Sequence, residues 1–99
     1  MTVSKAAEMD IKNVLSYISE NLSALQAAKN LALSIKESYL LLRENPYVYT
    51  FCEDERLKLE GFRRVVIKNY ILLYKINEDK NEVFIARFFY GGRDYAVLI

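Results

Sequence analysis

Residues 62–99 place basic and tyrosine side chains where they could contact an anionic partner. The candidates, in chain order, are Arg63, Arg64, Lys68, Arg87, Tyr90, Arg93 and Tyr95. This stretch has seven Lys/Arg against four Asp/Glu, a charge of +3, whereas residues 1–61 have seven against nine, a charge of −2. Charges in solution are screened over ~8 Å. The local excess therefore matters more than the net charge of +1, and it suits an acidic or anionic partner.

The sequence Tyr90-Gly91-Gly92-Arg93-Asp94-Tyr95 predicts a sharp corner, because paired glycines permit positive φ and close backbone approach. Arg93 would project from this corner beside two tyrosines. That combination suits stacking on a nucleic-acid base together with a phosphate contact. The alternative is local, with Arg93 paired to Asp94 and the tyrosines capping the core.

Arg87 stands in the middle of an apolar run that reads as a central strand. A charge in that position must be paired or must open onto a cleft. We expect either a structural pair with Asp94 or a loop carboxylate, or a functional role. Strand alternation assigns its face, which it is expected to share with Val83, Ile85 and Phe89, opposite Phe84, Ala86 and Phe88.

The residue types exclude several chemistries. The chain has no histidine and a single cysteine, Cys52, so an internal disulfide, a zinc site and a histidine-based dyad are not expected. Phosphate-binding loops and nucleophile elbows are absent from the sequence. We therefore expect no metal and no cofactor. Catalysis would have to use Arg, Lys, Tyr or carboxylates, as in RNA cleavage by attack of a 2′-hydroxyl.

Two helices are predicted ahead of the basic region. Apolar residues at helical spacing predict the first from about Ala6 to about Asn21, with Ser4 as its N-cap. A capping box at Ser23–Gln26 predicts the start of the second, which Asn45-Pro46 should end. The link between them is short, so we expect an antiparallel hairpin.

Strands are predicted at about Phe62–Ile67, Tyr70–Ile76 and Val83–Phe89, with a short final strand at Tyr95–Ile99. Residues 47–61 read as a loop. The tight Lys68-Asn69 connection contains an asparagine that tolerates positive φ. Residues 1–3 resemble the end of a first strand, either a stub or the remainder of a strand that begins earlier. The fold class is α+β, one domain over residues 1–99, with the helix hairpin on one face of an antiparallel meander.

The sequence shows neither a signal peptide nor an apolar run near the ~20 residues that span a bilayer. A cytoplasmic protein without a membrane partner is expected.

The order of motifs resembles a known family. Two helices precede Gly-Phe-Arg-Arg-x-x-x-x-Asn-Tyr-Ile-Leu-Leu-Tyr-Lys-Ile, which precedes Glu-Val-x-Ile-x-Arg-x-x-Tyr-Gly-x-Arg-Asp-Tyr. This pattern resembles the RelE/ParE superfamily of bacterial toxins. The resemblance implies the toxin of a type II toxin–antitoxin (plasmid stabilisation) system, which inhibits growth and is neutralised by a cognate antitoxin. A homodimer or a toxin–antitoxin hetero-oligomer is compatible with it.

The superfamily contains two activities. RelE-type members cleave mRNA on the ribosome, and for that activity the resemblance assigns catalysis to Arg63, Arg87, Arg93 and Tyr95. ParE-type members inhibit DNA gyrase, and for target or partner binding it assigns Arg63, Arg64, Lys68, Arg87, Tyr90, Arg93 and Tyr95. The sequence Tyr-Ile-Leu-Leu-Tyr lacks the mid-sheet arginine of the nucleases, which favours the ParE-like branch. The alternatives are a ribosome-dependent endoribonuclease and a non-toxic member that only binds antitoxin.

Overall fold

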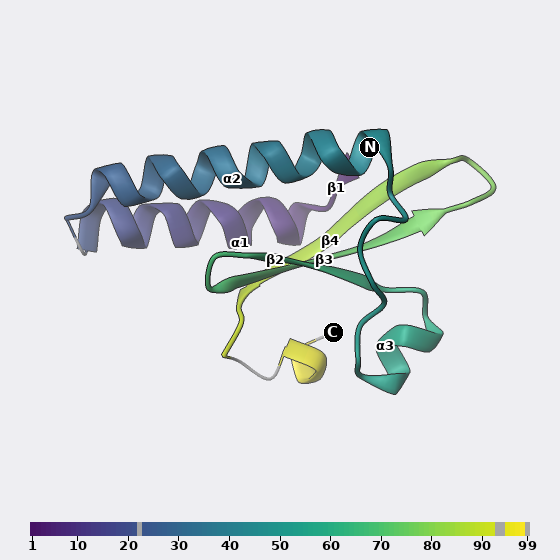
Figure 1. Ribbon diagram of the computed structural model, residues 1–99. Helices are drawn as coiled ribbons and strands as arrows, with labels where there is room; N and C mark the ends of the chain where they lie inside the picture. Colours follow the sequence, from purple (N-terminus) through teal and green to yellow (C-terminus); the bar gives the residue numbers. More distant parts are fainter. Residues whose placement is uncertain (22, 93–94, 99) are drawn as a thin grey trace.

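The computed structural model describes residues 1–21, 23–92 and 95–98, with only the backbone of residues 95 and 98. Its elements are β1 (Thr2–Val3), α1 (Lys5–Ser16), a π-helical turn η1 (Tyr17–Asn21), α2 (Leu25–Glu44), α3 (Glu55–Leu59), β2 (Arg63–Ile67), β3 (Tyr70–Asn77), β4 (Glu82–Tyr90) and a 3-10 turn η2 (Tyr95–Leu98). Figure 1 shows α1 and α2 on one face of the sheet, with α3 and η2 on the other. The predicted α+β class is confirmed.

Ser4 begins α1 as predicted, because its Oγ accepts a hydrogen bond from the Ala7 amide at 3.0 Å. The same hydroxyl donates to the Ala86 carbonyl at 2.6 Å, and the Ser4 amide donates to the Ile85 carbonyl at 2.9 Å. The cap therefore fastens the start of α1 to β4.

The second helix ends where the sequence predicts, at Glu44 before Asn45-Pro46. Its predicted capping box is wrong. Ala24 is the N-cap and makes no side-chain cap bond, while Ser23 has a φ of 49°. A backbone hydrogen bond joins the start of the second helix to η1 instead, since the Ala24 amide donates to the Ile18 carbonyl at 3.1 Å.

Within the described residues the strands form one sheet in the order β1-β4-β3-β2. The neighbours β2, β3 and β4 are antiparallel, and β1 is parallel to β4. The predicted short first strand is confirmed, and it pairs only with Phe84 and Ile85. In the β2–β3 turn the positive φ of 55° belongs to Lys68 rather than to the expected Asn69.

A β-bulge in β4 overturns the predicted alternation around Arg87. Leu73 pairs with Arg87 and Tyr74 pairs with Ile85, so Ala86 has no partner in the register. Beyond the bulge each side chain changes face. Phe88 consequently joins Val83 and Ile85 on the helix side, and Phe89 joins Ala86 on the opposite side.

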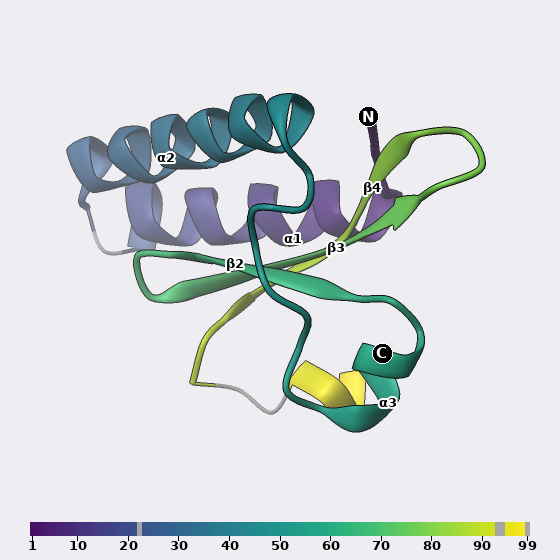
Figure 2. The same cartoon turned by 45° about the vertical axis from the view of Figure 1, so that its right-hand side comes forward.

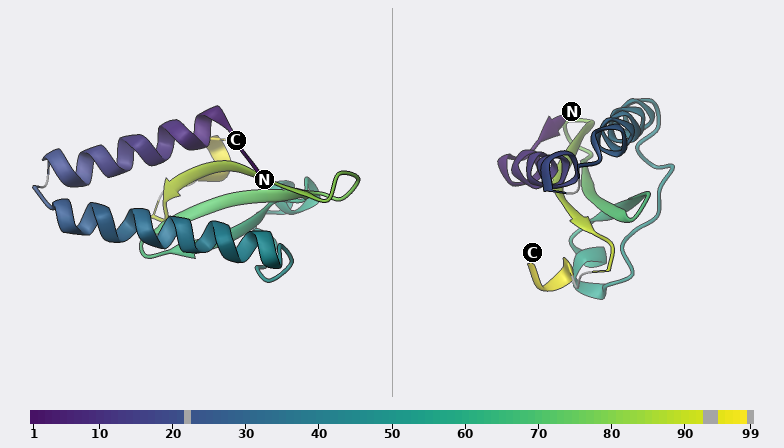
Figure 3. Two further views of the ribbon diagram at one scale, coloured as in Figure 1. Left: turned by 90° about the horizontal axis from the view of Figure 1, so that it is seen from above. Right: turned by 90° about the vertical axis from the view of Figure 1, so that its left-hand side faces the viewer.

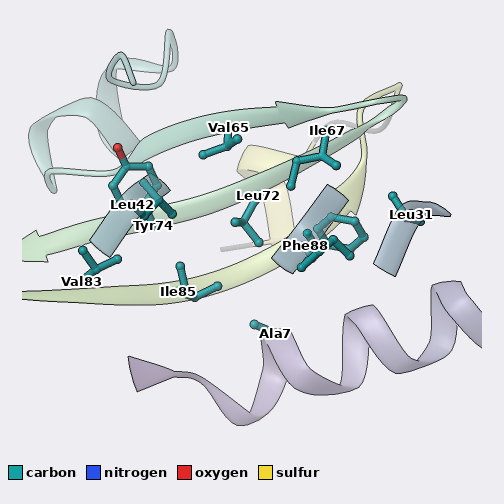
Figure 4. Packing of buried hydrophobic residues seen from close by; sticks show 11 residues of the cluster. Ala7, Leu31, Leu42, Val65, Ile67, Leu72, Tyr74, Val83, Ile85 and Phe88 are labelled. Atoms are coloured by element: carbon teal, nitrogen blue, oxygen red, sulfur yellow. The ribbon is translucent and has the colours of Figure 1, made fainter. Parts of the chain in front are cut away.

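The larger core lies between the helix hairpin and the sheet (Figure 4). The right-hand view of Figure 3, which looks along the helices, shows α1 and α2 on the same side of the sheet. The buried members of this core are Ala7, Leu31, Ile35, Leu42, Val65, Ile67, Leu72, Tyr74, Val83, Ile85 and Phe88. Burying a large apolar side chain stabilises the fold by about 1.5–3 kcal/mol, so this layer fixes the hairpin on the sheet.

A second core covers the other face of the sheet, which the sequence did not predict. Its buried members are Cys52, Leu57, Phe62, Ile71, Leu73, Ala86 and Phe89. Helix α3 supplies Leu57 from within the stretch predicted as a loop, and its N-cap Asp54 accepts from the Leu57 amide at 3.0 Å. Two hydrophobic layers therefore sandwich the sheet.

The predicted final strand is wrong, because residues 95–98 form η2. Ala96 packs against the second core, and Arg56 Nη2 donates to the Ala96 carbonyl at 2.5 Å. The end of the chain thus covers apolar surface rather than extending the sheet. In the ranges that the structure describes, no helix combines the length and apolarity needed to cross a membrane.

Tyr74 → Phe should destabilise the protein at neutral pH. The fully buried Tyr74 hydroxyl donates to the Pro46 carbonyl at 2.6 Å, tying β3 to the end of α2. Removing the donor leaves a carbonyl without its partner, at a cost of about 1–3 kcal/mol. Urea unfolding measures the change. Tyr17→Phe, on a tyrosine that is 53% exposed, is the matched control and should leave the unfolding free energy unchanged.

Alkaline pH should expose a second effect of Tyr74. Burial raises the pKa of its phenol to about 12, whereas an unfolded tyrosine titrates near ~10. Below pH ~10 the phenol is protonated in both states. Between ~10 and ~12 only the unfolded state loses the proton, so the free energy of unfolding falls as pH rises. Tyr74→Phe should flatten this slope, and identical slopes in both proteins would contradict the assignment.

Candidate functional site

Arg87 lies at the sheet edge and is paired with Asp10 of α1. Arg87 Nε and Nη2 donate to Asp10 Oδ2 and Oδ1 at 2.8 and 3.1 Å, a bidentate geometry. The two side chains are only 29% and 17% exposed. Hydrogen bonding to Asp10 raises the pKa of the Arg87 guanidinium. The arginine is therefore charged and held inside the fold.

Asp10 was not among the partners that the sequence suggested. Asp94, one of the expected partners, lies outside the described residues, as does Arg93. Helical spacing does place Asp10 on the apolar side of α1, three residues after Ala7 and four before Val14, but it does not show which residue Asp10 pairs with. Asp10 Oδ2 also accepts from the Phe88 amide at 3.0 Å. One carboxylate therefore satisfies both a side chain and the edge of β4.

Arg63 is enclosed by the segment that follows α2. Its Nη1 donates to the Tyr49 carbonyl at 2.7 Å, and its guanidinium lies 4.0 Å from the centre of the Phe51 ring. The Tyr47 ring is 5.4 Å away. Cation–π contacts of this kind hold an arginine against aromatic faces. Arg63 thereby anchors residues 47–51 to the start of β2.

Lys68 and Tyr90 approach one end of the sheet together with Gly91. The Gly91 amide donates to the Asn69 carbonyl at 2.7 Å, which joins the end of β4 to the β2–β3 turn. Tyr90 is 51% exposed and meets Tyr70 edge to face at 6.0 Å between ring centres. Tyr90 is therefore exposed at the end of β4, and tyrosine is among the residue types enriched at protein interfaces.

Arg64 is more weakly engaged, with Nη2 at 3.4 Å from Glu53 Oε1, and that carboxylate is 86% exposed. Such exposed pairs contribute about 0–1 kcal/mol. Arg64 thus remains available to a partner.

The structure does not gather the predicted site residues into one cluster. Arg63 is four residues from Ile67 along β2, about 13 Å at the usual rise per residue, and it lies at the end of the strand away from Lys68 and Tyr90. Arg87 is separated from Arg63 by β3. Arg93 and the side chain of Tyr95 fall outside the described residues. The site assignment stays a prediction.

A helix hairpin on a short sheet, with basic residues along its strands, is the architecture expected of a RelE/ParE-type toxin. The family model described as "ParE toxin of type II toxin-antitoxin system, parDE" matches residues 1–95. The chain therefore belongs to the ParE toxin family, within the RelE/ParE superfamily of type II toxin–antitoxin toxins. No curated protein matches the chain. The family implies a cognate antitoxin as partner.

The Asp10–Arg87 pair should be energetically coupled. Asp10→Ala leaves the guanidinium and the Phe88 amide without their acceptor, and should lower the free energy of unfolding by about 1–3 kcal/mol. Once Asp10 is absent, Arg87→Ala should cost less than it does in the parent chain. A double-mutant cycle measured by urea unfolding gives the coupling energy. Lys12→Ala, on an exposed residue of the same helix, is the control. Additive effects of the two substitutions would show that the pair does not hold α1 on β4.

Proposed function

We propose that this ParE-family toxin inhibits growth by binding DNA gyrase in the bacterial cytoplasm, and that its cognate antitoxin neutralises it as part of a plasmid-stabilisation system. The observation that carries the choice of binding over catalysis is the separate engagement of Arg63 and Arg87. The Tyr49 carbonyl and two rings hold the first, and Asp10 holds the second.

Cleavage of RNA by its own 2′-hydroxyl needs a base, a cation and an acid around one phosphate. Arg63 of β2 pairs with Tyr74 of β3, and Arg87 of β4 pairs with Leu73 on the other side of β3. Strand β3 therefore lies between the two arginines, and neighbouring strands are about 4.8 Å apart. They also face different layers, since Arg63 lies among the aromatics of residues 47–51 while Arg87 contacts Phe89 of the second core. This separation disfavours a shared phosphate site.

The exposed residues support the binding proposal. Lys68, Tyr90 and Arg64 are accessible on the surface of the strand region, to which Lys68 and Arg64 bring positive charge. An acidic antitoxin segment would be attracted to the same surface. The toxin would then remain in a hetero-oligomeric complex with its antitoxin until the antitoxin is lost.

Expression of the chain without its antitoxin should arrest growth, with loss of negative supercoiling in reporter plasmids and intact mRNA. The purified protein should inhibit supercoiling by gyrase in vitro. A vector carrying an early stop codon is the control. Codon-phased mRNA cleavage would establish the ribonuclease alternative instead. Normal growth with abundant folded protein would point to a family member that only binds antitoxin.

Tyr90 should contribute to target binding. Tyr90→Ala removes a half-exposed ring at the end of β4, and we expect at least tenfold more protein to be needed for half-inhibition of gyrase. An aromatic hot spot at an interface is worth about 2 kcal/mol or more, and a factor of ten corresponds to about 1.4 kcal/mol. The matched control is Tyr17→Ala, because Tyr17 is exposed to a similar extent on the helix hairpin, 53% against 51%. Equal inhibition by both variants would exclude Tyr90 from the target surface.

A further inference from the structure

The outer face of α2 carries exposed leucines on the side opposite the core. The helix buries Leu31, Ile35 and Leu42 against the sheet. Successive residues of an α-helix are about 100° apart around its axis, so Leu33 and Leu40 point almost directly away from that buried face. Their side chains are 56% and 50% exposed. Figure 2, like Figure 1, shows α2 at the upper boundary of the molecule, with no other labelled element above it. The described chain therefore leaves these two leucines uncovered.

Two rows of side chains flank these leucines, one basic and one largely acidic. Lys36 lies about 60° to one side of Leu33, and Glu37 lies about 40° to the other side. The seven-residue repeat extends both rows, with Lys29, Lys36 and Arg43 on one side and Asn30, Glu37 and Glu44 on the other, all exposed. Among the residues that the structure describes, these five charges form no ion pair. Both rows are therefore available to a partner.

This pattern is self-complementary when two copies of α2 lie parallel. Leucines that recur every seven residues form the seam of a coiled coil, and the charges beside the seam decide partner and orientation. A two-fold axis along the helices would place Leu33 on its counterpart and Leu40 on its counterpart. The same rotation exchanges the flanks, so Lys36 of one copy would face Glu37 of the other, displaced by only about 1.5 Å along the axis. Arg43 and Glu44 would meet in the same way.

An antiparallel pair of the same helices lacks this complementarity. A two-fold axis perpendicular to α2 keeps each flank opposite its own kind, so the basic rows would face each other and the acidic rows would do the same. Like charges that meet across an interface are strongly unfavourable and exclude the wrong arrangement. The charge rows therefore select a second copy with its α2 parallel.

We propose that the outer face of α2 is a self-association surface, on which two copies of this chain pair through parallel α2 helices. Only two leucines of each copy enter the seam, and interfaces below about 1,200 Å² are typical of weak, transient complexes. The dimer is therefore reversible and forms at high protein concentration. This goes beyond the proposed function, because pairing of the purified chain requires neither gyrase nor antitoxin nor a growth defect.

Sedimentation velocity of the purified chain, from micromolar to millimolar concentration at low salt, tests the pairing. We expect a reversible equilibrium between monomer and dimer. Leu33→Ser removes one leucine from each side of the seam and should raise the dissociation constant at least tenfold. Leu25→Ser is the matched control, because Leu25 is 58% exposed on the same helix but lies outside the row of Leu33 and Leu40. Urea unfolding of each variant confirms that the monomer is intact.

A charge exchange tests the orientation. Lys36→Glu and Glu37→Lys should each weaken the parallel dimer at least threefold, because each creates like charges across the seam. The double variant, with the two charges exchanged, should restore the parent affinity. In an antiparallel pair neither single substitution would change much, since like charges would face each other before and after it. Restoration by the double variant therefore identifies the parallel arrangement.

Several outcomes would overturn the proposal. A chain that stays monomeric at millimolar concentration does not use this face for self-association. If Leu25→Ser weakened the dimer as much as Leu33→Ser, the seam would lie elsewhere. Single charge variants without effect would exclude parallel pairing. A monomeric chain whose Leu33 and Leu40 methyl resonances shift only with added antitoxin would assign the face to the antitoxin.

Discussion

The hydrogen bonds between α1 and the edge of β4 are the constraint on which the arrangement of this molecule depends. A two-residue β1 covers only part of that edge, and a buried peptide group without a partner costs about 1–3 kcal/mol. The Ser4 amide and hydroxyl donate to the Ile85 and Ala86 carbonyls of β4, and the Asp10 carboxylate accepts from the Phe88 amide. The start of α1 thereby satisfies peptide groups of β4 beyond the residues that pair with β1. These hydrogen bonds set the orientation of α1 on the sheet, and the position of α2 beside α1 follows from it.

The same constraint determines what the arginines do. Asp10 accepts from the β4 edge and from Arg87 at once, which commits that guanidinium to the fold. Arg63 is likewise committed to the segment after α2. Arg63 and Arg87 could serve a nuclease if they converged, but each stabilises a different contact of the fold. The accessible cations Arg64 and Lys68 lie on a strand surface and at the β2–β3 turn.

The two edges of the sheet consequently differ in character. The β4 edge is closed by a helix whose side chains satisfy it, whereas residues 50–52 close only the first half of β2. Among the described residues, the first half of β2 is therefore the part of this edge that residues 50–52 pair with.

Local sequence determined the two long helices and the three long strands. Apolar spacing, Ser4 and Asn45-Pro46 set the two helices, and alternation set three strands to within one or two residues, because these signals act over a few neighbouring residues. The sequence also singled out Lys68 and Tyr90 as candidates for binding, and both are exposed in the structure. The partner of Arg87, the bulge at Ala86, the second core and η2 could not. Asp10 and Arg87 are 77 residues apart, so no local pattern pairs them. Only folding of the chain decides which peptide groups lack a strand partner, and hence which side chains must satisfy them.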